Sequence, residues 1–362
     1  MTVKLPSLTI GKHTSKYPII QGGMGIRVSA SRLAGAVATA GGIGVIATVG
    51  LCLNSSLWDG KRETYFEANK QALIEELRTA RKKSPDGIIG TNCMVAISDF
   101  ELAARTSAEN GADLIISGAG LPLSLPEYVA GYPDVALVPI VSSTKAAELI
   151  IKRWERRYSR LPDALVVESP NTAGGHLGAK FEEVQDSRYS HHQVIPQLLE
   201  MIENQFKVKI PVIIAGGVWN NEDLVQMLEL GAAGVQIATR LISTYECDAD
   251  QRFKDLLRKA TQDDIVLINS PVGFPGRVIR NPFVERFLKG EKIPDRCIAN
   301  CLRRCSFKKE GKGFCIAQAL DRAQKGDVER GLFFSGSNGF KEQKMASVQE
   351  IINDLAGKKD NV

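Results

Sequence analysis

Short apolar runs rich in β-branched residues alternate with amphipathic stretches over most of the chain. Eight runs have the length and continuous hydrophobicity of buried parallel strands. They span residues 18–21, 43–48, 88–95, 113–117, 136–142, 164–168, 210–215 and 234–238. Helical patterns follow them at about 30–40, 64–83, 98–110, 124–131, 144–158, 192–205, 220–230 and 248–259. Eight β/α units predict an α/β fold, a (β/α)8 TIM barrel, with a doubly wound open sheet as the alternative.

The β/α alternation stops near residue 260. Residues 1–260 therefore predict the barrel, and residues 261–362 predict a cap or substrate region packed over the barrel mouth. Prolines, four cysteines and a Gly/Ser loop occupy this second region, and the pattern at 345–356 predicts a closing helix.

Polar and glycine-rich motifs follow the predicted strands. In a barrel of this type the carboxyl ends of the strands carry the site, so these motifs are expected to meet at one face. They are QGGMG at 21–25, Asn92, Ser142 and Ser143, AGGHLG at 173–178, IAGGV at 214–218 and QIATR at 236–240.

The last two motifs predict a phosphate site. Gly216 and Gly217 permit close backbone approach, and the residues at Ala238 and Thr239 offer backbone amides and a hydroxyl at the start of a helix. The alternative is that the two glycines only shape a tight turn.

The QGGMG motif lacks the spacing and the acidic partner of a dinucleotide-binding loop. Gly22 and Gly23 with the polarizable Met24 fit instead a surface against a flat aromatic ring system, although such a stretch alone is often just a turn. Asn92 ends a strand that otherwise belongs to the core, so its amide needs either a ligand or a neighbouring loop as partner.

His176 follows two glycines that leave its imidazole unobstructed. An ordinary pKa near 6.5 suits proton transfer at neutral pH, and its place on the catalytic face favours that role over the commoner structural one. His191 and His192 lie in a long polar loop and are expected to be solvated or to cap the next helix.

Four cysteines form a C-x3-C-x3-C-x9-C pattern in the predicted cap. If 297–305 is helical, three thiols share one face and, with the fourth, could ligate zinc or an iron–sulfur cluster. The residues are Cys297, Cys301, Cys305 and Cys315. The competing interpretation is free, partly buried thiols, because the spacing matches no common metal motif.

Composition narrows the classes of partner that the protein is expected to bind. A net charge of +5 with mixed signs does not support a nucleic-acid surface. The sequence has neither a signal-peptide pattern nor an apolar run of about 18 residues, so a cytoplasmic protein with no membrane partner is expected. A small-molecule substrate is expected, and a homodimer is compatible with the sequence.

Six motifs, in this order, carry a family resemblance: PIIQGGMG, LAGAVATAGGIGVI, GTNCM, AGGHLG, IPVIIAGGV and GVQIATR. Together they resemble the nitronate monooxygenase family, formerly called 2-nitropropane dioxygenases, and its relative, the flavin-dependent enoyl-acyl-carrier-protein reductase. The resemblance implies FMN across the barrel mouth and His176 as the catalytic base. It implies FMN contacts from Gly22, Gly23, Met24, Asn92, Gly174, Gly175, Gly216, Gly217, Ala238, Thr239 and Gly336.

The implied activity is oxidation of alkyl nitronates by O₂ to a carbonyl compound and nitrite. The alternative is NAD(P)H-dependent enoyl-acyl-carrier-protein reduction, because QGGMG is closer to the reductase form of this motif. A third interpretation is a barrel that binds a phosphorylated metabolite or flavin as a sensor without turnover.

Overall fold

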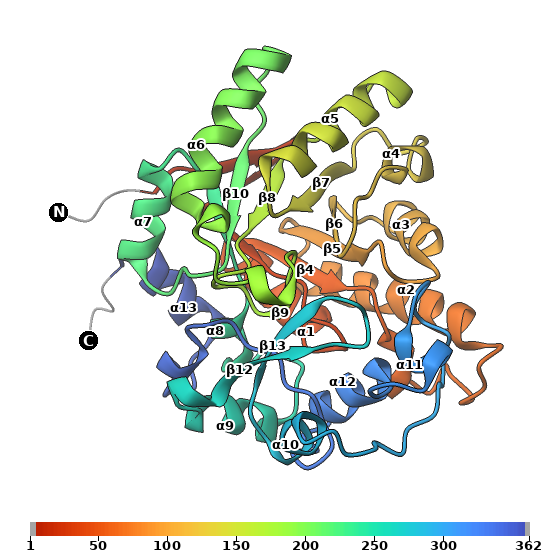
Figure 1. The fold of residues 1–362 in the computed structure, drawn as a ribbon. Coiled ribbons are helices and arrows are strands. Elements are labelled where there is room, and N and C mark those ends of the chain that lie inside the picture. Colours follow the sequence, from red (N-terminus) through yellow and green to blue (C-terminus); the bar gives the residue numbers. More distant parts are fainter. Residues whose placement is uncertain (1–4, 359–362) are drawn as a thin grey trace.

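A closed barrel of eight parallel strands, surrounded by helices, forms the centre of the computed structural model, which describes residues 5–358 (Figure 1). Neighbouring strands follow one another along the chain, and β11 pairs with β3 to close the ring. The strands are β3 (Ile19–Gln21), β4 (Ile43–Ala47), β5 (Ile88–Met94), β6 (Leu114–Gly118), β7 (Ala136–Val141), β8 (Leu165–Glu168), β10 (Val212–Ala215) and β11 (Gly234–Ile237). Each coincides with a predicted run, with β6 extending one residue beyond it, so the TIM-barrel prediction is confirmed and the open sheet is wrong.

Helices occupy every predicted helical range of the barrel. They are α1 (Ser31–Thr39), α2 (Tyr65–Lys83), α3 (Phe100–Glu109), α4 (Leu125–Tyr128), α5 (Thr144–Tyr158), α6 (His191–Met201), α7 (Asn221–Glu229), α8 (Thr239–Ile242) and α9 (Gln251–Lys259), of which α8 was not predicted. Polar caps fix the starts of α5 and α7: Ser143 accepts a hydrogen bond from the backbone of Ala146 at 3.3 Å, and Asn220 forms a capping box with Asp223. No helix in the described residues is long and apolar enough to cross a membrane.

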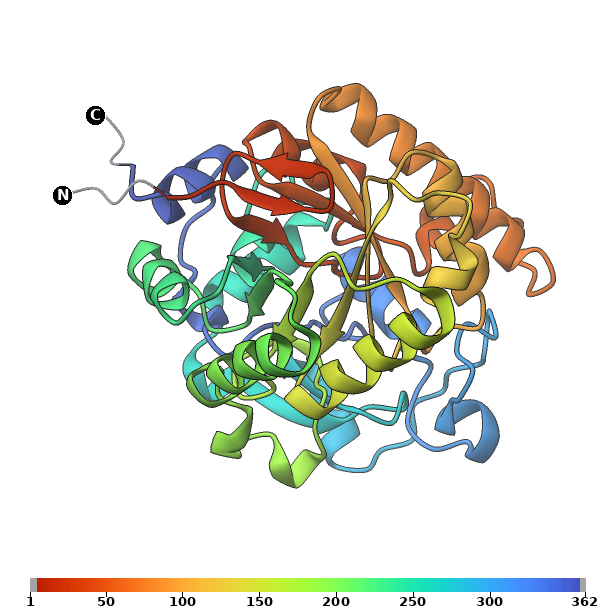
Figure 2. The ribbon, with the colours of Figure 1, turned by 90° about the horizontal axis from the view of Figure 1, so that it is seen from above.

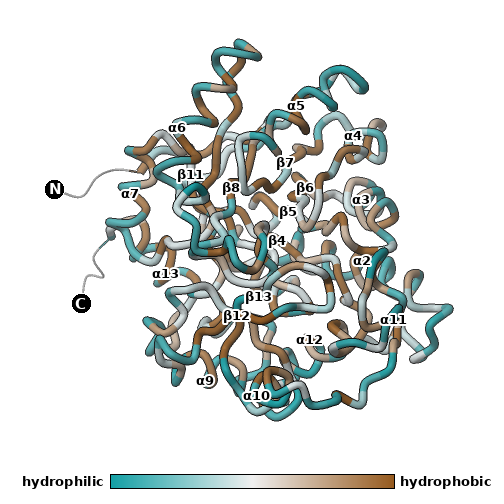
Figure 3. Tube along the Cα trace, viewed as in Figure 1, coloured by the Kyte–Doolittle hydropathy of each residue, from teal (hydrophilic) through white to brown (hydrophobic). Residues whose placement is uncertain are grey.

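The strands are mostly apolar because both of their faces are buried. On β4, Ile43 and Val45 belong to the cluster inside the barrel, whereas Ile46 packs outside against the helices. A hairpin of β1 (Leu8–Ile10) and β2 (His13–Ser15) adds two further apolar side chains to the interior cluster. Figure 3 shows the brown, hydrophobic strands enclosed by helices whose outward parts are teal.

The segment after residue 260 lies with α9 in the lower part of Figure 1. It contains β12 (Ile265–Asn269), β13 (Pro275–Ile279), α10 (Pro282–Leu288), α11 (Ser306–Glu310), α12 (Ile316–Gln324) and α13 (Val348–Leu355). The predicted closing helix corresponds to α13, which packs against α1 and α7 (Figure 2).

One short strand links this segment to the barrel. Between β8 and α6, β9 (Gly175–His176) pairs with β13 and so joins the β12–β13 hairpin in a three-stranded sheet. The division into residues 1–260 and 261–362 stays a prediction, and residues 1–4 and 359–362 lie outside the described residues.

Candidate active site at the barrel mouth

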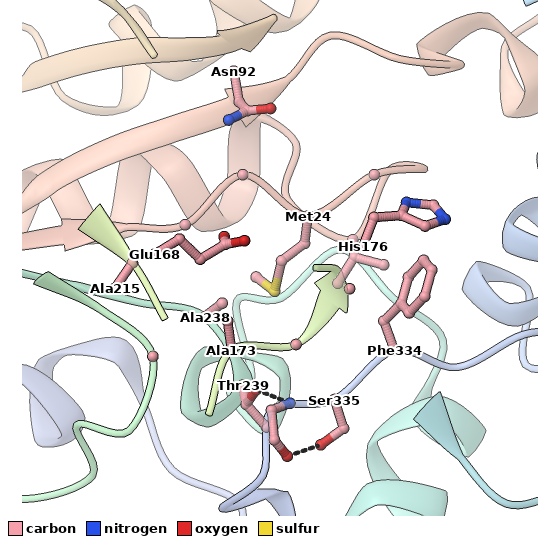
Figure 4. A pocket seen from close by; sticks show the side chains of 18 of the residues that line it. Met24, Asn92, Glu168, Ala173, His176, Ala215, Ala238, Thr239, Phe334 and Ser335 are labelled. Carbon is pink, nitrogen blue, oxygen red and sulfur yellow. Dashed lines mark hydrogen bonds between the residues drawn. The ribbon is translucent and has the colours of Figure 1, made fainter. Parts of the chain in front are cut away.

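A cavity of about 260 Å³ opens at the carboxyl ends of the barrel strands. Every residue predicted for cofactor binding or catalysis lines it, although these residues come from loops far apart in the sequence. They are Gly22, Gly23, Met24, Asn92, Gly174, Gly175, His176, Gly216, Gly217, Ala238, Thr239 and Gly336. The fold therefore gathers the predicted set in one place (Figure 4), while the role of each residue stays a prediction.

Glycines let the loops around the cavity approach one another closely. A Cβ atom on Gly23 would lie 2.3 Å from the Cβ of Asn92, and one on Gly174 would lie 2.6 Å from the backbone nitrogen of Gly336. Neither position has room for a side chain. These loops therefore present backbone rather than side chains to the cavity.

Hydrogen bonds tie the loops together at one end of the cavity. Thr239 Oγ1 accepts a hydrogen bond from the backbone nitrogen of Gly336 at 2.9 Å, and Asn338 Nδ2 donates one to the Gly217 carbonyl at 2.9 Å. Gly216 and Gly217 have φ angles of +93° and +88°, which residues other than glycine rarely adopt. The predicted phosphate-binding turn is thus held against the C-terminal segment.

His176 lies on β9, where its backbone pairs with Gly276 of β13. Its Nε2 is 2.8 Å from Oγ of Ser270, and its ring meets the edge of Phe334 with the ring centres 4.9 Å apart. Burial lowers the pKa of His176 to about 4. The imidazole is therefore neutral near pH 7 and able to accept a proton.

Glu168 ends β8, and in Figure 4 its carboxyl group points into the cavity. Burial raises its pKa to about 7, against the opposing effect of the positive charge of Arg277. Burial also lowers the pKa of Arg277 to about 10, which still leaves it charged near neutral pH. Desolvation therefore outweighs the attraction between this carboxyl and guanidinium.

The residues present fit FMN. Thr172 Oγ1 and Gln236 Oε1 are buried without a hydrogen-bond partner among the described residues, and both residues line the cavity. Buried polar atoms in native proteins are nearly always satisfied, so these two favour a ligand rich in hydroxyl groups, such as a ribityl chain. The glycine-lined wall leaves space for a flat ring, and the turn at Gly216 and Gly217 suits a phosphate.

Several residues that line the cavity were not predicted. Glu168 and Gln236 interrupt apolar strands, and that interruption is a signal that could have found them. Thr172 and Ser270 carry no comparable signal, since only the fold brings Ser270 to His176.

His191 and His192, at the start of α6, differ in their exposure to solvent. His191 was expected to be solvated or to cap the helix, but it is buried at the start of α6, with Nε2 3.2 Å from the carbonyl oxygen of Ala215, and α6 has no side-chain cap. His192 is exposed, as expected.

The cysteine pattern does not form the predicted metal site. The premise of a helix over 297–305 is wrong, because α11 starts only at Ser306, and Cys297, Cys301, Cys305 and Cys315 are all free. No three His, Cys, Asp or Glu side chains within residues 5–358 are arranged to hold a metal ion. Burial raises the pKa of Cys301 to about 12, which favours a protonated thiol over a metal-binding thiolate. A zinc or iron–sulfur site therefore has no support.

The barrel and its glycine-lined cavity define an α/β-barrel enzyme. The model of the nitronate monooxygenase family matches residues 6–358, and the chain belongs to that family. It is thus an oxidoreductase of the flavin-dependent type.

Individual relatives agree with this assignment. A probable nitronate monooxygenase of Staphylococcus saprophyticus is 24% identical over 381 residues, which cover 97% of each chain. Two solved structures share the fold. FabK of Thermotoga maritima has a TM-score of 0.70 and 23% identity, and the match covers 95% of this chain and 92% of that one. A nitroalkane oxidase of Streptomyces ansochromogenes has a TM-score of 0.70 and 16% identity, and the match covers 95% of this chain and 96% of that one.

Proposed function

We propose that the protein binds FMN at the barrel mouth and oxidises alkyl nitronates of the 2-nitropropane type with O₂, giving a carbonyl compound and nitrite. The observation that carries the proposal is the single cavity at the barrel mouth, which all the predicted FMN residues line together with His176. Membership of the nitronate monooxygenase family supports the same reaction.

Three groups of residues would hold the cofactor. The backbone at Gly22 and Gly23, with Met24, would lie against the flavin ring, and Asn92 would contact the ribityl or phosphate side. The ribityl chain and phosphate would bind to the remaining loops, at Gly174, Gly175, Gly216, Gly217, Ala238, Thr239 and Gly336. Bound FMN supplies the two-electron acceptor and the route of these electrons to O₂.

His176 sets the preference between two forms of the substrate. A nitronate has already lost its carbon-bound proton, so its oxidation needs no base. A neutral nitroalkane must give that proton to the enzyme, and the His176 imidazole would accept it. A base with a pKa of about 4 is weak near pH 7, so we expect nitronates to react much faster than neutral nitroalkanes.

Absorbance spectroscopy tests the proposal. The purified protein reconstituted with FMN is expected to show the spectrum of oxidised flavin, which propyl-2-nitronate bleaches rapidly under anaerobic conditions and O₂ restores. Bleaching by NADH or NADPH but not by the nitronate would favour the enoyl reductase. A flavin that none of these reduces would favour the sensor, and failure to bind FMN would contradict both enzyme functions.

A pair of variants tests the role of His176. His176→Asn is expected to retain FMN and nitronate oxidation while losing at least a hundredfold in turnover of neutral 2-nitropropane. His192→Asn is the matched control. Because His192 is exposed on α6, this variant should turn over both substrates normally. Unchanged nitroalkane turnover in His176→Asn would remove His176 from the role of base.

A further inference from the structure

A second cavity, of about 890 Å³, adjoins the first at His176. Its walls come largely from residues 177–183 and the β12–β13 turn, and they contain none of the eleven residues predicted to contact FMN. The two cavities share four lining residues: Ala119, Ile140, Glu168 and His176. A molecule in the second cavity would therefore meet His176 and Glu168 without displacing the cofactor.

The second cavity has the properties of a substrate compartment. Its volume falls within the roughly 300–1,000 Å³ typical of ligand pockets. Leu177 and Phe274 contribute apolar walls, and Ser142 and Asn269 contribute polar groups. The two cavities meet at the four shared residues, so a molecule in the second cavity would contact these residues beside a bound flavin.

Glu168 and His176 are the two ionisable groups at this junction, and burial shifts their pKa values in opposite directions, upward for Glu168 and downward for His176. Near pH 7 the His176 imidazole is therefore neutral, and the Glu168 carboxyl is poised between its protonated and ionised forms. Such pairs often mark the acid and the base of a site.

Few charges act on Glu168. Three ionisable groups lie around it on neighbouring elements: Arg277 on β13, His176 on β9 and His191 on α6, behind β8. The wall of the second cavity contains four more, Lys180, Glu182, Glu183 and Tyr189. Of these only Arg277 affects the pKa of Glu168, and no hydrogen bond from a described residue contributes. The Arg277 guanidinium is engaged by the carbonyl groups of Pro170, Asn171 and Ala173. A cation committed in this way is poorly placed to neutralise an incoming anion.

We propose that Glu168 controls the binding of anions on the His176 side of the active site, admitting them when its carboxyl group is protonated and repelling them when it is ionised. The protonated carboxyl donates a hydrogen bond to an anionic oxygen, whereas the carboxylate places a second negative charge in the same desolvated space. For substrates, the inference rests on the proposed function: a nitronate is such an anion, so its binding would weaken as the pH rises through the pKa of Glu168.

Nitrite provides a probe that requires no turnover. We would titrate the FMN-bound protein with sodium nitrite between pH 6 and pH 9 and follow the flavin absorbance. In the wild type the Kd for nitrite should rise about tenfold per pH unit above pH 7, since only the protonated form binds. Glu168→Gln should bind nitrite with a Kd independent of pH, and Glu168→Asp should restore the dependence.

Glu182→Gln is the matched control, because Glu182 lines the same cavity but does not influence Glu168, and it should behave as the wild type. Retention of the wild-type pH dependence in Glu168→Gln, or no nitrite binding by the wild type at pH 6, would overturn the proposal.

A second measurement uses only the wild-type protein. Saturating nitrite should raise the titration midpoint of the Glu168 carboxyl, observed by carbon-13 NMR of labelled glutamate, and an unchanged midpoint would also contradict the proposal. Both measurements are separate from nitronate oxidation, although the nitrite titration requires bound FMN. If nitronate fails to bleach the flavin while nitrite binding depends on Glu168, nitronate oxidation is wrong and the anion control stands.

Discussion

The guanidinium group of Arg277 donates a hydrogen bond of 3.0 Å to the backbone carbonyl of Asn171. A second hydrogen bond of the same length reaches the carbonyl of Pro170, and a third reaches that of Ala173. Arg277 is almost completely buried, with 3% of its surface exposed. One cation from β13 therefore fixes the loop that leads from β8 to His176.

Replacing Arg277 with Met should destabilise the protein by about 2–4 kcal/mol, because the carbonyl groups lose a buried, charged donor. Urea unfolding of the protein without FMN measures this change. Arg280→Met is the control, since Arg280 forms a half-exposed pair with Glu285 whose loss should cost less than about 1 kcal/mol. Equal losses in the two variants would contradict the role of Arg277.

Replacing Gly23 with Ala should weaken FMN binding at least tenfold. The new Cβ would lie 2.3 Å from the Cβ of Asn92, so the side chain of Asn92 or the loop after β3 must move out of position. Equilibrium dialysis with FMN measures the Kd. Gly131→Ala has no atom within 4 Å of the new Cβ and should bind FMN normally; a normal Kd in Gly23→Ala would show that this cradle does not hold the cofactor.

Activity toward neutral nitroalkanes should persist at acidic pH. Because burial lowers the pKa of His176 to about 4, the imidazole stays neutral and able to accept a proton down to that pH. The acidic limb of kcat/KM should therefore fall near pH 4, both in the wild type and in His192→Asn. A limb near pH 6.5 would show that His176 titrates as an exposed histidine.

Glu168→Gln should stabilise the protein at neutral and alkaline pH. The folded-state pKa of about 7 lies above the ordinary value of 4.5, so the wild type loses stability as the pH rises from 4.5 through 7, where the folded protein must bury a charge. The variant avoids this cost and should exceed the wild type by about 1–3 kcal/mol at pH 8, with little difference at pH 4.

Thermal unfolding across this pH range checks the expectation. Glu182→Gln changes an exposed carboxylate and should show no such trend. A Glu168→Gln advantage that is the same at pH 4 and pH 8 would contradict the shifted pKa.

Local pattern predicted the barrel because each strand is buried on both faces and is therefore mostly apolar, as at Ile43, Val45 and Ile46. The motifs at the carboxyl ends of the strands also predicted where the cavity lies, since a parallel barrel places all such ends at one face. The cysteines show the limit of spacing, because the helix that would align Cys297, Cys301 and Cys305 does not form.

The sequence by itself thus determined the eight β/α units and the glycine-rich loops that meet at the barrel mouth, because these follow from periodicity and from backbone freedom at single residues. Only the tertiary structure decided the environment of His176. It pairs β9 with β13, brings His176 into contact with Ser270, and buries Glu168 and His176 so that their pKa values shift in opposite directions. Desolvation and long-range contacts depend on which distant segments pack together, and no local pattern encodes them.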